Sequence, residues 1–188
     1  ASTQEAIIQV DQTQETGSTP PIFQLPAKVD LYFAGTVEPV RHEVFVNHRS
    51  QQIRLPAASK PALIIFDAER SILATWEDNK THDELAYQLK NAPLFLDRYQ
   101  AVNGLDTEAD DYISLLELAL QDPFYGIRSA ALTQLPSEDW PASITEQVAK
   151  LAAADEHSEV RSIAIVQLAE VSYEGIDDLA QQALDAQP

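Results

Sequence analysis

Hydrophobic and polar residues alternate with a period of about two from residue 6 to residue 76, a pattern typical of β-strands. In residues 28–33, for example, Val29, Leu31 and Phe33 would share one buried face. Turns rich in Gly, Pro, Ser and Asn separate the segments, at spacings that suit an antiparallel sandwich of about seven short strands. The clearest strands are expected at residues 8–10, 28–33, 44–46, 53–55, 63–66 and 72–76.

After Trp76 the hydrophobic period lengthens to that of amphipathic helices. We expect Asp122, followed by Pro123, and Ser158, followed by Glu159, to act as helix N-caps. The pattern predicts two domains, a β-sandwich at residues 1–78 and a helical domain at residues 79–188. The helices are expected at residues 81–90, 92–103, 107–120, 123–135, 139–153, 158–171 and 174–186.

The helical half contains an internal repeat with an offset of 33 residues. Residues 122–135 align without gaps on residues 155–168, and a weaker copy of the same pattern begins at Arg98. The residues that we expect to form the framework of the repeat are Asp122, Arg128, Ala131 and Leu135, their counterparts Asp155, Arg161, Ala164 and Leu168, and Arg98 and Ala101 in the weaker copy.

Hydrophobic residues four positions apart in each copy form one apolar stripe on a helix, and the small Ala allows a neighbouring helix to come close. Stacked helix pairs would bury these stripes in one continuous core. The pattern resembles short HEAT repeats, which implies an α-α superhelix in which Asp and Arg tie adjacent repeats together. The competing interpretation is that Arg128 and Arg161 bind a carboxylate ligand.

Composition excludes several classes of function. The chain of 188 residues has no Cys and a net charge of −18, of which residues 81–188 contribute −15. Such a charge repels nucleic-acid phosphates and anionic lipid surfaces, and no apolar stretch is long enough for a membrane span. Since the chain begins at Ala1 and lacks Met, we expect a piece of a longer protein. The sequence favours neither a cytoplasmic nor an exported location.

No motif in the chain completes a catalytic, cofactor or metal site. His42 and Glu43 begin a zinc-peptidase-like motif, but Val46 stands where the second His is needed. His48, His82 and His157 are expected to be surface or capping residues. The acidic residues 106–111 lack the Gly of a calcium loop, so Asp106 and Glu108 are expected to cap the next helix.

The order of the two halves resembles the C-terminal region of aminopeptidase N-like zinc metallopeptidases. The resemblance rests on residues 66–76, followed by Lys80, Leu85, Gln88 and Leu89 and by Arg98 and Ala101, and on residues 10–14 and 23–29. It implies a non-catalytic segment that supports an upstream catalytic domain, whose H-E-x-x-H motif binds zinc, and that shapes peptide access.

Two other functions fit the same pattern. The first is a HEAT-repeat scaffold that binds a protein partner. The second is a relative of the peptidase architecture in the transcription machinery that has lost catalysis, although the negative charge argues against DNA contact.

Overall fold

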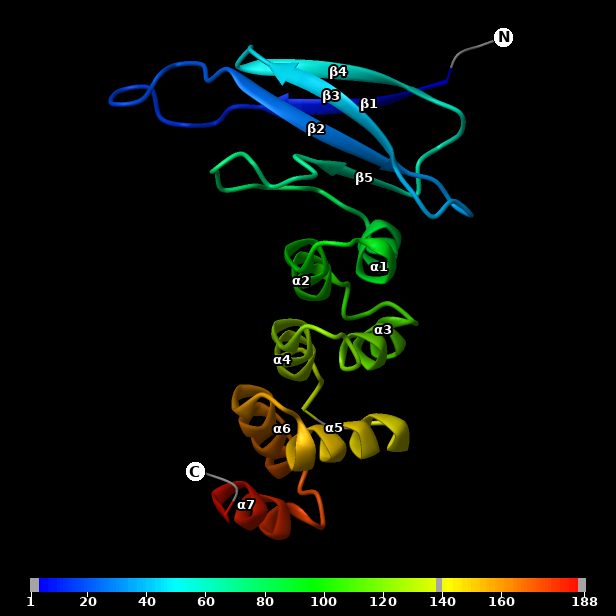
Figure 1. Ribbon diagram of the computed structural model, residues 1–188, viewed down its shortest axis with the longest axis vertical. Helices are drawn as coiled ribbons and strands as arrows, with labels where there is room; N and C mark the ends of the chain where they lie inside the picture. Colours follow the sequence, from blue (N-terminus) through cyan, green and yellow to red (C-terminus); the bar gives the residue numbers. More distant parts are fainter. Residues whose placement is uncertain (1–3, 138–139, 186–188) are drawn as a thin grey trace. The chain divides into compact units, whose positions relative to one another are not determined.

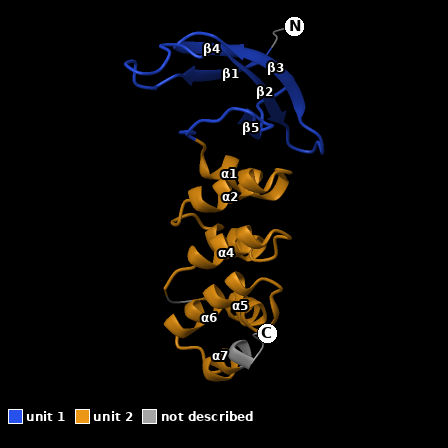
Figure 2. Ribbon diagram, turned by 60° about the vertical axis from the view of Figure 1, so that its left-hand side comes forward, with its two compact units in different colours: residues 1–79 blue, residues 80–188 orange. Residues whose placement is uncertain are grey.

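The computed structural model describes residues 4–137 and 140–185 and contains an antiparallel β region followed by seven helices (Figure 1). The chain divides into two compact units, residues 1–79 and residues 80–188 (Figure 2). Each unit has a hydrophobic core of its own. The expected boundary after residue 78 lies next to this division.

The first unit is built from two small antiparallel sheets. Strand β1 (Gln4–Asp11) pairs with β4 (Ser50–Ala57), and β2 (Leu25–Tyr32) lies between β3 (Val40–Val46) and β5 (Leu63–Phe66). Alternate residues of the strands point inward, so both sheets contribute to one apolar cluster. The buried members of this cluster are Ala6, Ile53 and Leu55 from the first sheet and Val29, Leu31 and Val46 from the second.

The strand expected at residues 72–76 is wrong, and the described residues of the first unit hold five strands. The Asp67 carboxylate explains the difference. It accepts hydrogen bonds from the Ser71 amide and hydroxyl and from the Ile72 amide, at 2.8–3.0 Å, which fixes a turn directly after β5. The chain then leaves the sheet, and Trp76 packs on Phe66 with ring centroids 5.5 Å apart.

All seven expected helices are present in the second unit, with shorter bounds. They are α1 (His82–Asn91), α2 (Phe95–Gly104), α3 (Tyr112–Ala119), α4 (Tyr125–Thr133), α5 (Ala142–Ala154), α6 (Ser158–Glu170) and α7 (Ile176–Asp185). The expected first residue of the fifth helix, 139, and last residue of the seventh, 186, lie outside the described residues. None of the helices that the structure describes has the length and apolarity to cross a membrane.

Helices α2, α4 and α6 are stacked in one column, with α1, α3 and α5 beside them (Figure 1). The repeat positions Ile127, Ala131, Val160 and Ala164 are fully buried between the helices. Because Ala has only a methyl group, the backbones of α4 and α6 approach closely at these points. Leu135, Leu168 and Ala101 belong to the same core.

The expected N-caps are wrong. Helix α4 begins after Phe124 and α6 begins after His157, and neither residue makes a side-chain capping bond. Ser158 is the first residue of α6 rather than its cap. Asp106 accepts a hydrogen bond from the Glu108 amide in a local turn, and α3 starts only at Tyr112. The described helices do contain one capping box, in which Thr81 and Glu84 close the start of α1.

Candidate functional site

Arginine side chains tie each helix pair of the second unit to the next. Arg98 on α2 donates two hydrogen bonds to the carboxylate of Asp122, at 2.7 and 3.1 Å. Its third nitrogen donates to the carbonyl oxygens of Ala92 and Pro93. Asp122 also accepts from the amide of Phe124, at 2.8 Å. The carboxylate therefore binds the previous repeat instead of capping its own helix.

Arg128 on α4 repeats this arrangement one helix pair further along the chain. It donates two hydrogen bonds of 2.8 Å to Asp155, and its third nitrogen donates to the carbonyls of Asp122 and Pro123. Asp155 accepts in addition from the His157 amide, at 2.9 Å. The side chains are only 9% and 4% exposed, so this is a buried, bidentate ion pair.

The electrostatics of the pair follow from this geometry. Burial by itself raises the pKa of the Asp155 carboxyl, but the hydrogen bonds from Arg128 and from the His157 amide outweigh it. The pKa of Asp155 therefore lies below its ordinary value. The same hydrogen bond raises the pKa of Arg128, so both groups are charged at neutral pH.

Arg161 on α6 repeats only part of the pattern. It donates to the carbonyls of Asp155 and Glu156, at 2.7 and 3.3 Å. Among the side chains that the structure describes, no carboxylate meets its other edge.

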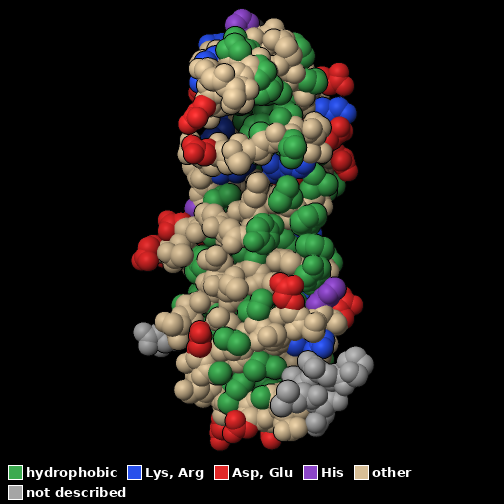
Figure 3. Space-filling model, turned by 90° about the vertical axis from the view of Figure 1, so that its left-hand side faces the viewer, with side chains coloured by type: hydrophobic (Ala, Val, Ile, Leu, Met, Phe, Trp, Pro, Cys, Tyr) green, Lys and Arg blue, Asp and Glu red, His purple; other side chains and the backbone are tan. Residues whose placement is uncertain are grey.

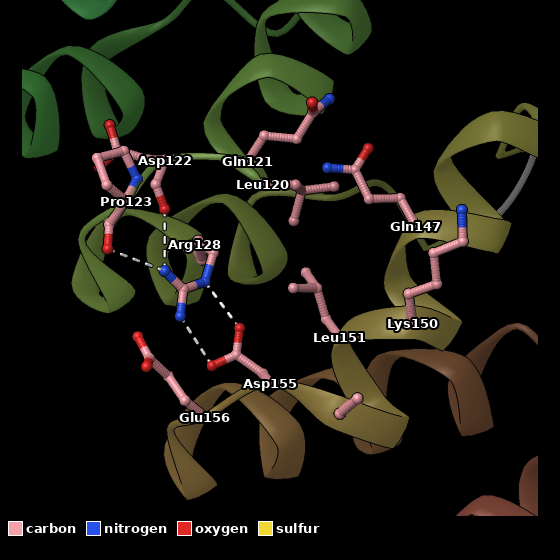
Figure 4. A pocket seen from close by; sticks show the side chains of 11 residues that line it. Leu120, Gln121, Asp122, Pro123, Arg128, Gln147, Lys150, Leu151, Asp155 and Glu156 are labelled. Carbon is pink, nitrogen blue, oxygen red and sulfur yellow. Dashed lines mark hydrogen bonds and ion pairs between the residues drawn. The ribbon is translucent and has the colours of Figure 1, made fainter.

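A groove of about 560 Å³ lies beside the Arg128–Asp155 pair, between the α3–α4 connection and α5 (Figure 4). Gln121, Gln147, Lys150 and Glu156 bring polar groups to it, and Leu120 and Leu151 form its apolar wall. The Arg128 nitrogens are already committed to protein acceptors, so Lys150 is the cation that remains for a ligand. The groove can bind a polar group, but it pairs no nucleophile with a general base.

A row of aromatic rings follows the N-terminal ends of α2, α4 and α6. The ring of Phe95 lies 4.6 Å from that of Phe124, Phe124 lies 4.9 Å from Tyr125, and Tyr125 stacks on His157 at 4.1 Å. We call Phe95, Tyr99, Phe124, Tyr125 and His157 the aromatic stripe. Figure 3 shows hydrophobic side chains gathered along this side of the molecule, with acidic groups and a histidine among them.

The first unit contains a second charged cluster, which the sequence reasoning missed. Arg41 on β3 faces Asp30 on β2 and donates two hydrogen bonds of 2.7 Å to its buried carboxylate. Arg41 and Lys28 also share the carboxylate of Glu69. The hydrogen bond to Asp30 raises the pKa of Arg41. Only the strand register could have revealed this pair.

The histidines occupy separate places. His42 faces Val29 on the neighbouring strand, and its Nε2 is buried without a hydrogen-bond partner. His48 lies in the turn between β3 and β4. His82 accepts from the Asp106 amide through Nδ1 and contacts Asp111 through Nε2, at 2.7 Å, which lowers the pKa of Asp111. Nowhere in residues 4–137 and 140–185 do three potential metal ligands gather.

The sequence reasoning also missed the aromatic stripe, although a signal for it exists. Phe124 and His157 are 33 residues apart, and Phe95 and Tyr125 are 30 apart, so each pair occupies one position of the repeat. An alignment restricted to identical residues does not reveal such a column. Its members share a ring instead of a name.

No protein-family model and no curated protein sequence matches the chain. Among solved structures, it is similar to the crystal structure of Legionella pneumophila aminopeptidase A in complex with aspartic acid, with a TM-score of 0.67 and 9% sequence identity. The similarity covers 98% of this chain and 28% of that chain, so this chain spans less than a third of the aminopeptidase's length. The fold of this chain is therefore related to that of part of an aminopeptidase.

Proposed function

We propose that this chain is the non-catalytic C-terminal segment of a zinc aminopeptidase, where it supports the catalytic domain and shapes the access of peptides. The observation that carries the proposal is the fold similarity to an aminopeptidase over 98% of the chain. Under this proposal the first unit is a β-sandwich and the second an α-α superhelix of HEAT-like repeats.

The residues of this chain do not fit a zinc site. Three protein ligands and an open position are the usual minimum for catalytic zinc, and the described residues bring no such set together. His42 lies on a strand, and its neighbour on the same face, Val44, cannot bind a metal. The zinc ligands of the proposed enzyme would therefore belong to the catalytic domain.

The helical unit has two properties that suit a supporting and selecting role. The buried pairs Arg98–Asp122 and Arg128–Asp155 hold successive helix pairs in a fixed register, which favours a stiff wall. The net charge of −15 over residues 81–188 attracts the cationic N-terminal ammonium of a free peptide. Such a wall would raise the concentration of peptides near a catalytic domain without taking part in the chemistry.

The test is a comparison of enzyme variants in the full-length protein. Deletion of residues 80–188 should leave a small aminoacyl reporter nearly as reactive and should abolish discrimination between short and long peptides. Because a deletion can unfold its neighbours, a second variant keeps the unit and changes the exposed Glu146, Glu156 and Glu159 to Gln. This variant should raise KM for cationic peptides and leave kcat unchanged.

Two results would overturn the proposal. One is unchanged peptide turnover and length selectivity in both variants. The other is a reading frame upstream of Ala1 that encodes no H-E-x-x-H motif, together with absence of zinc and peptidase activity in the full-length protein. The second result would favour a scaffold that binds a protein partner.

A further inference from the structure

The aromatic stripe exposes large apolar side chains that the core does not use. Phe95 is 50% exposed and Tyr99 is 44% exposed, one turn apart on the same face of α2. The contacts from Phe95 through Phe124 and Tyr125 to His157 extend this surface over three stacked helices. A continuous apolar patch of this kind usually marks an interaction surface.

The charge of the second unit determines which partner suits the stripe. Residues 81–188 contain 20 acidic and 5 basic residues, and Arg98 and Arg128 are neutralised in buried pairs with Asp122 and Asp155. At the α6 end of the stripe, the exposed Glu156 lies 3.7 Å from the His157 ring nitrogen. An acidic partner would be repelled here, whereas a cationic one is attracted.

The spacing of the helices favours an extended occupant. Packed helices lie roughly 8–10 Å apart, so α2, α4 and α6 present aromatic side chains at about that interval. A polyproline II segment rises about 3.1 Å per residue and turns the same face outward at every third residue, about 9.3 Å apart. Aromatic surfaces bind such segments readily, because little conformational entropy is lost.

We propose that the aromatic stripe binds a cationic peptide segment in a polyproline II conformation, with an apolar side chain at every third residue. The apolar side chains would pack between the rings, and the Lys or Arg side chains would face the surrounding carboxylates. A segment of about seven residues would span the three helices. This surface is independent of the peptidase proposal, because it lies entirely within the second unit.

The experiment uses the 188-residue chain and labelled peptides of about twelve residues in fluorescence anisotropy. A peptide with the repeat Leu-Pro-Lys should bind, and its affinity should fall as salt is raised. A Leu-Pro-Glu peptide, and a cationic peptide with leucines two residues apart, should bind much more weakly. The two comparisons separate the contribution of charge from that of spacing.

Variants then locate the binding site. Phe95→Ser and Tyr99→Ser should each weaken binding about fivefold, since each removes one aromatic contact. Leu118→Ser is the matched control, because Leu118 is similarly exposed but lies on α3, and it should leave binding unchanged. Thermal unfolding identifies any variant that has lost its fold, and the other variant then decides.

Equal binding of the acidic and cationic peptides, or equal affinity in all variants, would overturn the inference. So would light scattering that shows a dimer abolished by Phe95→Ser, because the stripe would then be a contact between two copies. Any of these results leaves the peptidase proposal untouched, since that proposal is tested on enzyme activity.

Discussion

Asp155→Asn is the substitution whose effect the structure defines best. The carboxylate accepts two hydrogen bonds of 2.8 Å from Arg128, and both side chains are almost completely buried. Asparagine keeps the shape but removes the charge, which leaves the Arg128 guanidinium buried without a counterion. Breaking a buried pair in this way costs about 3–5 kcal/mol, a large part of the roughly 5–15 kcal/mol that stabilises a typical domain.

Each unit has its own tryptophan, so urea unfolding can be followed separately in each. Trp76 packs on Phe66 in the first unit, and Trp140 donates to the Pro136 carbonyl in the second. In a Trp76→Phe background, Trp140 fluorescence reports the helical unit alone. With a loss of about 3 kcal/mol, Asp155→Asn should lower the midpoint of that transition by about 1.5 M urea. In a Trp140→Phe background the transition of the first unit should not move.

Glu5→Gln is the matched control, because Glu5 pairs with Arg54 at 3.3 Å but both side chains are about half exposed. It should change stability by less than about 0.5 kcal/mol. The double variant Arg128→Met with Asp155→Leu should recover most of the loss, since it leaves no unpaired charge. A loss below about 1 kcal/mol for Asp155→Asn, or no recovery in the double variant, would refute the reasoning.

The same pair predicts the pH dependence of the helical unit. The folded-state pKa of Asp155 lies below the ordinary value of 3.8, so its contribution to stability is complete above that value. The contribution is lost as the pH falls through the lowered pKa. Asp155→Asn should therefore flatten the loss of stability of the helical unit below pH 4, and an unchanged acid profile would contradict the assignment.

Three further predictions concern other contacts of the helical unit. Ala131→Leu places extra volume at a fully buried contact and should cost about 1–3 kcal/mol in urea unfolding, whereas Ala153→Leu at an exposed site of α5 should be nearly neutral. Thr81→Ala removes the capping box of α1 and should cost about 1 kcal/mol in the same assay, with no loss if the cap is unimportant. His82→Gln removes the ring that lowers the pKa of Asp111, so carboxyl NMR titration should place that pKa near 3.8; an unmoved pKa would refute the contact.

Local pattern was enough to predict the order of the elements. A period of two in the first 66 residues and a longer period after residue 80 separate strands from helices, because each backbone conformation sets its own side-chain direction. The strand at residues 72–76 was wrong, because Asp67 holds a turn by side-chain hydrogen bonds that no periodicity records. The helix caps were wrong because Asp122 and Asp155 bind arginines from the preceding repeat.

The sequence by itself placed Arg98, Arg128, Asp122 and Asp155 in equivalent positions of a repeat, since equivalent positions need only a constant offset along the chain. Which arginine meets which carboxylate was decided by the tertiary structure. Arg98 reaches Asp122, 24 residues away, and Arg128 reaches Asp155, 27 residues away, because stacking brings each helix against the start of the next pair. The groove beside Arg128 and the aromatic stripe arise in the same way: both exist only where successive helices come into contact.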